Sequence, residues 1–248
     1  MCTVIVGVSQ SARCPLWLAA NRDEFLSRPS AAPTLSRETN LTMLAPTDLV
    51  AGGTWIGANS AGLVAAVTNR FGTLPDRTKL SRGELVRRAL RHRSTESAIG
   101  EIAALPPSQY NPFHVIVASR AAALLVIHTG AGLVTKSLDC GVHVITERSF
   151  GTEPAPREIW IRQQLDKLDS QARADSAHAA SLLRSHHDSD PFGSVCIHAP
   201  DRGYGTRSSS TIELHSEPNI IRYGFAEGPP CETDYVMQSL PLEKTEAH

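Results

Sequence analysis

Short apolar segments of strand length dominate the pattern of hydrophobic and polar positions along the chain. Most are rich in β-branched residues, which is typical of strands. Short turn-like segments at 57–62 and 129–132 connect two pairs of them, and such tight connections predict antiparallel neighbours. The predicted strands are Thr3–Val8, Leu16–Ala20, Leu63–Thr68, Phe113–Ala118, Ala123–His128, Val142–Thr146, Val195–His198 and Thr211–Leu214.

Several of these strands are apolar on both faces. Leu63–Val67 and His114–Ala118 lack the alternation of apolar and polar residues that marks an antiparallel sheet with one solvated face. We therefore expect a second sheet to cover one face of these strands and helices to cover the other, in a sandwich with helices outside two packed sheets.

Three segments have helical patterns. The first opens with Ser81-Arg82-Gly83-Glu84, which has the residue types of a capping box, and Leu80 and Leu85 are spaced as a hydrophobic staple. Arginines lie opposite its apolar stripe, and we interpret them as a solvated face rather than a basic patch. Further helices are predicted from Pro156 and over 172–185.

Length and charge narrow the class of protein. The chain has 248 residues, of which 41% are hydrophobic, and a formal net charge of -1. This charge argues against nucleic-acid binding, and no run approaches the roughly 18 apolar residues of a membrane helix. Because no stretch resembles an interdomain linker, we predict a single domain over 1–248. Segment 27–48 has the composition of a loop, and a polar tail is predicted from about 238.

The N-terminus and the cysteines indicate a compartment. The first eight residues lack the positive region and small-residue cleavage site of a secretory signal. The five cysteines are scattered and form neither a CxxC motif nor a disulfide framework. We therefore predict a cytoplasmic protein with reduced thiols.

Cys2 is the first candidate for chemistry. If the initiator methionine is removed, Cys2 carries both a thiol and a free α-amine that titrates near pH 7.7–8.0, roughly the pH of the cell. Nucleophile and base then lie on one residue. The alternative interpretation of the same position is a small buried residue that opens a strand.

Polar residues end the strand that begins at Leu16. On a strand, Asn21 and Asp23 share one face, and Arg22 and Glu24 share the other. A carboxylate beside the N-terminus would hold the protonated α-amine, and an amide would donate to a developing oxyanion. An exposed strand end with ordinary solvated charges is the alternative.

Five short motifs, in this order, resemble those of the NRDE family, the family of the transport and Golgi organisation 2 protein. The resemblance covers the chain from Met1 to about Gly228. This family is similar to the cysteine N-terminal nucleophile hydrolases, so the resemblance implies an α+β fold: a four-layer αββα sandwich with mostly antiparallel sheets. The motifs are Met1-Cys2-Thr3, Ala20-Asn21-Arg22-Asp23-Glu24, 51–57 (AGGTWIG), Val67-Thr68-Asn69-Arg70 and 203–211 (GYGTRSSST).

The resemblance also implies roles for single residues. Cys2 matches the nucleophile, and Asn21 and Asp23 match the polar pair of the amidase strand. Asn69 matches an oxyanion-stabilising asparagine, and Arg207 matches an arginine near the nucleophile.

One position departs from the amidase pattern. The amidases place an arginine directly before the asparagine, whereas this chain has Ala20 there and Arg22 after the asparagine. By strand alternation we expect Arg22 to point away from Cys2 unless the strand bulges.

Two functions are consistent with these residues. In the first, Cys2 attacks an amide or thioester carbonyl and forms a thioester acyl-enzyme, which hydrolysis or acyl transfer resolves. In the second, the same scaffold carries haem, acyl-CoA or a lipid without chemistry. Arg22, Arg70 or Arg207 would then pair with propionate or phosphate groups.

The remaining candidates have simpler interpretations. The glycine-rich segment 51–62 lacks the phosphate-loop pattern, and Trp55 within it either packs in the core or lines a pocket rim. His186-His187 with Asp188 and Asp190 is interpreted as a solvated loop, so no metal site is predicted. No resident cofactor is predicted, and haem is considered as a bound ligand through a histidine of an apolar strand.

Overall fold

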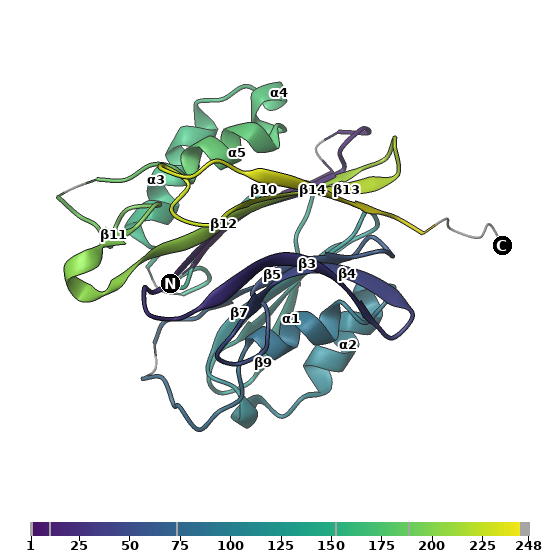
Figure 1. Ribbon diagram of the computed structural model, residues 1–248, viewed down its shortest axis with the longest axis horizontal. Coiled ribbons are helices and arrows are strands. Elements are labelled where there is room, and N and C mark those ends of the chain that lie inside the picture. The colour runs from purple at the N-terminus through teal and green to yellow at the C-terminus, as the bar shows by residue number, and fades with distance from the viewer. Residues whose placement is uncertain (1, 10, 73, 152, 188, 244–248) are drawn as a thin grey trace.

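A computed structural model describes residues 2–9, 11–72, 74–151, 153–187 and 189–243, and shows two antiparallel sheets packed face to face (Figure 1). The first sheet has the order β10-β1-β2-β12-β13-β14, with β11 paired to β12. Its strands are β1 (Cys2–Val8), β2 (Leu16–Phe25), β10 (Gly141–Ile145), β11 (His198–Ala199), β12 (Tyr204–His215), β13 (Ile220–Ala226) and β14 (Val236–Pro241).

The second sheet follows the chain order from β3 to β9. From β4 onward each of its strands pairs antiparallel with the strand before it. Its strands are β3 (Ser30–Glu38), β4 (Leu41–Asp48), β5 (Ile56–Asn59), β6 (Val64–Asn69), β7 (Phe113–Ala118), β8 (Ala123–His128) and β9 (Leu133–Ser137).

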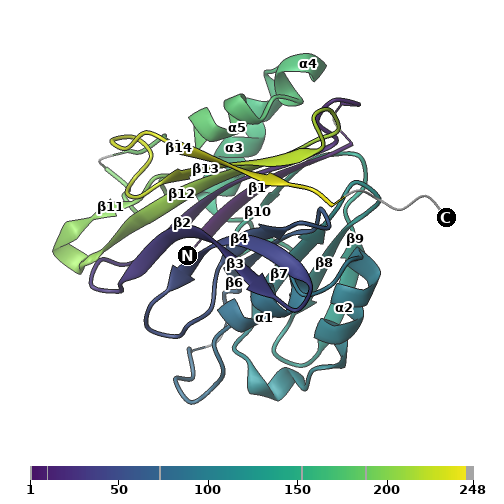
Figure 2. The ribbon, with the colours of Figure 1, turned by 45° about the vertical axis from the view of Figure 1, so that its right-hand side comes forward.

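Helices cover the outer face of each sheet (Figures 1 and 2). The helices α1 (Gly83–Ala89) and α2 (Thr95–Ala104) pack on the second sheet. The first sheet carries α3 (Pro156–Asp166), α4 (Ser170–Arg173) and α5 (Ser176–Leu182). The predicted four-layer αββα sandwich is therefore confirmed. Within the described ranges, every helix is too short or too polar to cross a membrane.

Three apolar layers explain why the strands are apolar on both faces. Between the sheets, Val4 of β1 packs in the same cluster as Ile116 of β7. The next residue of β1, Ile5, points outward and packs with Ile161 of α3. Each such side chain contributes about 1.5–3 kcal/mol when it is fully buried, so two buried faces per strand stabilise both interfaces of the sheet.

The structure corrects several predicted boundaries. Segment 27–48 is not a loop, because it forms the β3–β4 hairpin at the edge of the second sheet. The polar tail begins later than predicted, since β14 extends to Pro241. The predicted helix over 172–185 is divided into α4 and α5.

The predicted capping box does not form at the start of α1. Arg82 is the N-cap and makes no side-chain capping bond, while the hydroxyl of Ser81 accepts a hydrogen bond from the Gly83 N–H at 3.3 Å. Leu80, the predicted staple residue, is 51% exposed. Helix α2 was not predicted from the sequence; its N-cap is Ser94, whose side chain accepts from the Ser97 N–H.

Candidate active site

The register of β1 against β2 decides which side chains share the neighbourhood of Cys2. Cys2 lies directly opposite Arg22, and Thr3 lies opposite Asn21. Directly opposed residues of an antiparallel pair project from the same face of the sheet. Val4 and Ala20, the next pair on the face of Cys2, belong to the core between the sheets. Cys2 and Arg22 therefore both face the second sheet, and the expectation that Arg22 points away from Cys2 is wrong.

A third residue extends this pair into a row. Ser208 of β12 lies opposite Arg22, so Cys2, Arg22 and Ser208 occupy three adjacent strands on one face. We call these three residues the Cys2 row. The hydroxyl oxygen of Ser208 is buried and has no hydrogen-bond partner among the described residues.

The guanidinium of Arg22 is held on two sides. Its central carbon lies 4.3 Å from the centroid of the Trp55 ring, and Nη2 lies 3.9 Å from Oδ2 of Asp48. Trp55 is partly buried and contacts both core clusters of the second sheet, so it packs in the core and also supports Arg22. The Nη1 atom of Arg22 is buried and has no hydrogen-bond partner within the described residues. An acceptor atom of a ligand would satisfy this donor.

Asp23 contacts Cys2 through the backbone and through charge. Burial raises the pKa of the half-buried Cys2 thiol, and the Asp23 carboxylate raises it further. The Asp23 N–H, which donates to the thiol, and the Arg22 guanidinium lower this pKa but do not offset burial. The thiol is therefore a proton donor at neutral pH, and a base is needed to form the thiolate.

The carboxyl group of Asp23 is itself buried. Its Oδ1 accepts a hydrogen bond from the hydroxyl of Thr206 at 2.7 Å, and its backbone carbonyl accepts one from the Tyr204 hydroxyl at 2.8 Å. Burial raises the pKa of Asp23, whereas the guanidinium of Arg157 and the Thr206 hydrogen bond lower it. Asp23 is thus fixed in place by both neighbouring side chains of β12.

Asn21 does not lie beside the thiol. It projects from the outer face of β2, where its amide nitrogen donates to the backbone carbonyls of Leu183 at 2.9 Å and Val195 at 3.0 Å. Both amide protons are used in these bonds, so donation to an oxyanion at Cys2 would cost one of them. Asn21 anchors the segment that follows α5 to the first sheet.

Asn69 and Arg70 lie at the end of β6 in the second sheet. Asn69 is exposed, and strand alternation places it on the helix side with Val67, whereas Thr68 faces the first sheet with His114. The structure therefore does not bring Asn69 into the Cys2 row. Burial and the charge of Arg70 lower the pKa of His114 to about 4.

Arg207 occupies an irregular position in β12. The register between β12 and β2 shifts between Thr206 and Ser208, so Arg207 is the extra residue of a β-bulge. Its Nε atom is buried and lacks a hydrogen-bond partner within the described residues, as does the Nε atom of Arg70.

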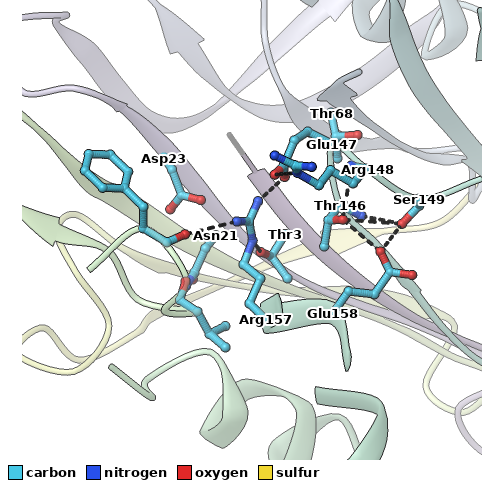
Figure 3. A network of polar contacts seen from close by, with 12 residues as sticks. Thr3, Asn21, Asp23, Thr68, Thr146, Glu147, Arg148, Ser149, Arg157 and Glu158 are labelled. Atoms are coloured by element: carbon cyan, nitrogen blue, oxygen red, sulfur yellow. Dashed lines mark hydrogen bonds and ion pairs between the residues drawn. The ribbon is translucent and has the colours of Figure 1, made fainter. Parts of the chain in front are cut away.

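A buried ion pair beside Asp23 was not predicted from the sequence. Arg157 of α3 is 2% exposed, forms an ion pair with Glu147, and donates from Nε to the hydroxyl of Thr3 at 3.0 Å (Figure 3). Figure 3 shows the Arg157 guanidinium between Asp23 on one side and Glu147 on the other. Because Arg157 and Thr3 are distant along the chain, no local pattern indicates this contact, and the sequence around Arg157 is typical of an exposed helix position.

Two cavities among the described residues lie away from this row. One, of about 250 Å³, is lined by residues such as Gly62, Arg120 and Leu242. The other, of about 140 Å³, lies between β4 and α1 and is lined by Glu38 and Arg87 among others. Neither cavity is lined by a residue of the Cys2 row, so neither is a pocket of the candidate active site.

The layered fold, with a cysteine opening an inner strand, places the chain in the class of proteins with an N-terminal nucleophile hydrolase fold. A Caenorhabditis elegans N-acylethanolamine-hydrolyzing acid amidase ortholog is similar, with a TM-score of 0.60, 12% identity and coverage of 86% of this chain and 92% of that chain. A variant of the conjugated bile acid hydrolase from Clostridium perfringens has a TM-score of 0.57 and 12% identity, covering 99% of this chain and 100% of that chain.

The family follows from the sequence comparison. The family model described as Transport and Golgi organisation 2 matches residues 1–223, and the chain belongs to this family. The Transport and Golgi organization protein 2 homolog of Homo sapiens is 27% identical over 234 residues, covering 83% of this chain and 84% of that protein. The Bos taurus homolog is 27% identical over 233 residues, with the same coverage. The predicted family is thus confirmed.

Proposed function

We propose that this protein is a cysteine N-terminal nucleophile hydrolase or acyltransferase, in which Cys2 attacks the carbonyl carbon of an amide or thioester. The observation that carries the proposal is the Cys2 row: the thiol lies opposite Arg22, and Ser208 lies beyond Arg22 on the next strand. Nη1 of Arg22 and Oγ of Ser208 are buried donors without partners among the described residues. An unsatisfied buried donor costs about 1–3 kcal/mol, which a bound carbonyl oxygen would offset. Two structurally similar proteins, an N-acylethanolamine-hydrolyzing amidase and a conjugated bile acid hydrolase, support amide chemistry on this fold.

The proton of the thiol needs an acceptor because burial raises the pKa of Cys2. After removal of Met1, the α-amine of Cys2 is that acceptor, with an ordinary pKa of about 7.7–8.0. The carboxylate of Asp23, the residue after the strand partner of Cys2, holds the protonated amine. The Thr206 hydrogen bond fixes that carboxylate.

The reaction then proceeds through addition, collapse and release of the acyl group. The sulfur forms a bond to the carbonyl carbon, the oxygen gains negative charge, and Arg22 and Ser208 donate to it. Collapse expels the amine or thiol leaving group, which takes the proton from the α-amine, and a thioester on Cys2 remains. Water or an acceptor nucleophile then attacks this thioester and releases the thiol. These donors replace Asn21 in the proposed oxyanion site, while a role for Asn69 stays a prediction.

A second candidate is a non-catalytic carrier of haem, acyl-CoA or a lipid. The buried Nε atoms of Arg70 and Arg207, which lack partners among the described residues, favour a ligand with acidic groups. Propionates or phosphates would pair with these guanidinium groups.

The test compares two chains made by specific proteolysis of a fusion, one beginning at Met1 and one at Cys2. Each is mixed with an activated acyl thioester, and intact mass reports the acyl adduct with time. The chain beginning at Cys2 should be acylated. Asp23→Asn should slow the reaction about 10²–10⁴-fold and Arg22→Gln about 10²–10³-fold, whereas Cys140→Ala should react normally.

Two outcomes would overturn the enzyme. One is acylation of the wild type at a rate no higher than that of Cys2→Ala. The other is acylation of the chain that keeps Met1 at the same rate as the chain that begins at Cys2. Haem titration of the same samples distinguishes the carrier function from the enzyme function. Tight haem binding that Arg70→Gln and Arg207→Gln weaken, with no acylation of the wild type, would establish the second candidate instead.

A further inference from the structure

Two cysteines and two histidines from three separate segments converge near β11. The Sγ atom of Cys196 lies 3.5 Å from Sγ of Cys231 and 3.5 Å from Nε2 of His198. The same nitrogen lies 3.0 Å from Sγ of Cys231. His186 completes the group: ligand atoms of His186, His198 and Cys231 all lie within 4.8 Å of one another.

We propose that His186, Cys196, His198 and Cys231 bind one Zn²⁺ ion. With Zn–S near 2.3 Å and Zn–N near 2.0–2.1 Å, a tetrahedral site has S···S edges of about 3.8 Å and S···N edges of about 3.6 Å. The observed S···S distance of 3.5 Å and S···N distances of 3.5 and 3.0 Å approach three of its six edges. His186 lies within 4.8 Å of His198 and Cys231 and would have to move closer to Cys196 to complete the tetrahedron. Two thiolates and two imidazoles form a donor set that favours Zn²⁺ over the oxygen-preferring Mg²⁺ and Ca²⁺.

The backbone holds these segments together independently of a metal. The Cys196 N–H donates to the Ser185 carbonyl at 2.8 Å, which places Cys196 beside the loop that carries His186. Cys196 lies two residues before His198, which opens β11. Cys231 lies in a turn closed by hydrogen bonds from the Glu232 and Thr233 N–H groups to the Pro229 carbonyl, both at 3.0 Å.

A carboxylate lies behind one of the proposed ligands. Nδ1 of His198 is 4.0 Å from Oε1 of Glu232, on the opposite side of the ring from the nitrogen that faces the two thiols. Metal-binding histidines commonly donate their other ring N–H to a carboxylate, which fixes the tautomer and orients the ring. At 4.0 Å the contact is longer than a hydrogen bond, so Glu232 would have to approach the ring to act in this way.

The proposed zinc site is connected to Asp23. The hydroxyl of Thr206 accepts a hydrogen bond from the Ile197 N–H, between two zinc ligands, at 2.8 Å and donates to Asp23 at 2.7 Å. Binding of Zn²⁺ to Cys196 and His198, on either side of Ile197, would hold this hydroxyl in place. Two thiol protons leave when the thiolates bind the ion.

The test is a cobalt titration of reduced, metal-free protein, followed by competition with Zn²⁺. One Co²⁺ per chain should produce a sulfur-to-cobalt charge-transfer absorption, which one equivalent of Zn²⁺ removes. Cys231→Ser and Cys196→Ser should each lower the Co²⁺ affinity by more than about 10²-fold, because each removes a ligand. Glu232→Gln, which changes a residue behind a ligand, should lower it by only about 10–10²-fold. Two matched controls, Cys140→Ser and His187→Asn, should bind as the wild type does.

The wild-type titration decides the proposal even if a variant fails to fold, which far-UV circular dichroism checks. No charge-transfer absorption in the reduced wild type would overturn the proposal. The same absorption in the Cys196→Ser/Cys231→Ser double variant would also overturn it. A Cys196–Cys231 disulfide that resists reduction, seen as two missing thiols without bound metal, would assign the pair a redox role instead.

Discussion

The Arg157–Glu147 ion pair gives a stringent prediction about what holds the candidate active site together. Arg157→Met keeps much of the side-chain volume but removes the ion pair with Glu147 and the hydrogen bond to Thr3. The Glu147 side chain is only 6% exposed, so the variant leaves a buried carboxylate whose remaining cation, Arg148, lies 4.0 Å away. Losing one partner of a buried pair typically costs about 3–5 kcal/mol. That is a large part of a total stability of about 5–15 kcal/mol.

Urea unfolding followed by tryptophan fluorescence measures this loss, and the chain supplies a matched control. Arg93 also pairs with a glutamate, Glu243 at 2.7 Å, but both side chains are exposed, by 62% and 38%. Arg93→Met should therefore cost less than about 1 kcal/mol. The double variant Arg157→Met/Glu147→Gln should lose far less than the sum of the single losses, because the charge left unpaired is gone. Equal stability of Arg157→Met and Arg93→Met would refute the reasoning.

Three further predictions concern other buried groups. Burial and a nearby arginine lower the pKa of His114 from 6.5 to about 4, so unfolding binds a proton and stability should fall as pH drops from about 6.5 to 4, by at most about 3 kcal/mol; His114→Gln should flatten this profile, and an unchanged profile would contradict the assignment. A Cβ added at Gly7 would lie 2.2 Å from Cε2 of Trp17, so Gly7→Ala should cost about 1–3 kcal/mol in urea unfolding, and wild-type stability would count against that packing. Burial raises the pKa of Cys14 to about 11 while Cys140 is exposed, so peptide mapping after alkylation at neutral pH should find Cys140 modified before Cys14. Modification of Cys14 before Cys140 would contradict the burial of Cys14.

The sequence by itself determined the layers of this protein. Strands such as Leu63–Val67 and His114–Ala118 are apolar at consecutive positions, and only a layer on each side removes both faces from water. The short motifs around Cys2 and Asp23 were sufficient to indicate the family. The β3–β4 hairpin escaped prediction because much of β3 is exposed and its residues, such as Ser36 and Arg37, are typical of a loop.

The tertiary structure alone decided which of these residues meet. Alternation along β2 separates Arg22 from Asn21, but only the pairing register places Arg22 opposite Cys2, and a slip of one residue would exchange the faces. Arg157 and Thr3, like Cys196 and Cys231, become neighbours through packing of segments that are distant along the chain. Periodicity reports the environment of one element at a time, whereas a site depends on distances between elements, and the fold determines these distances.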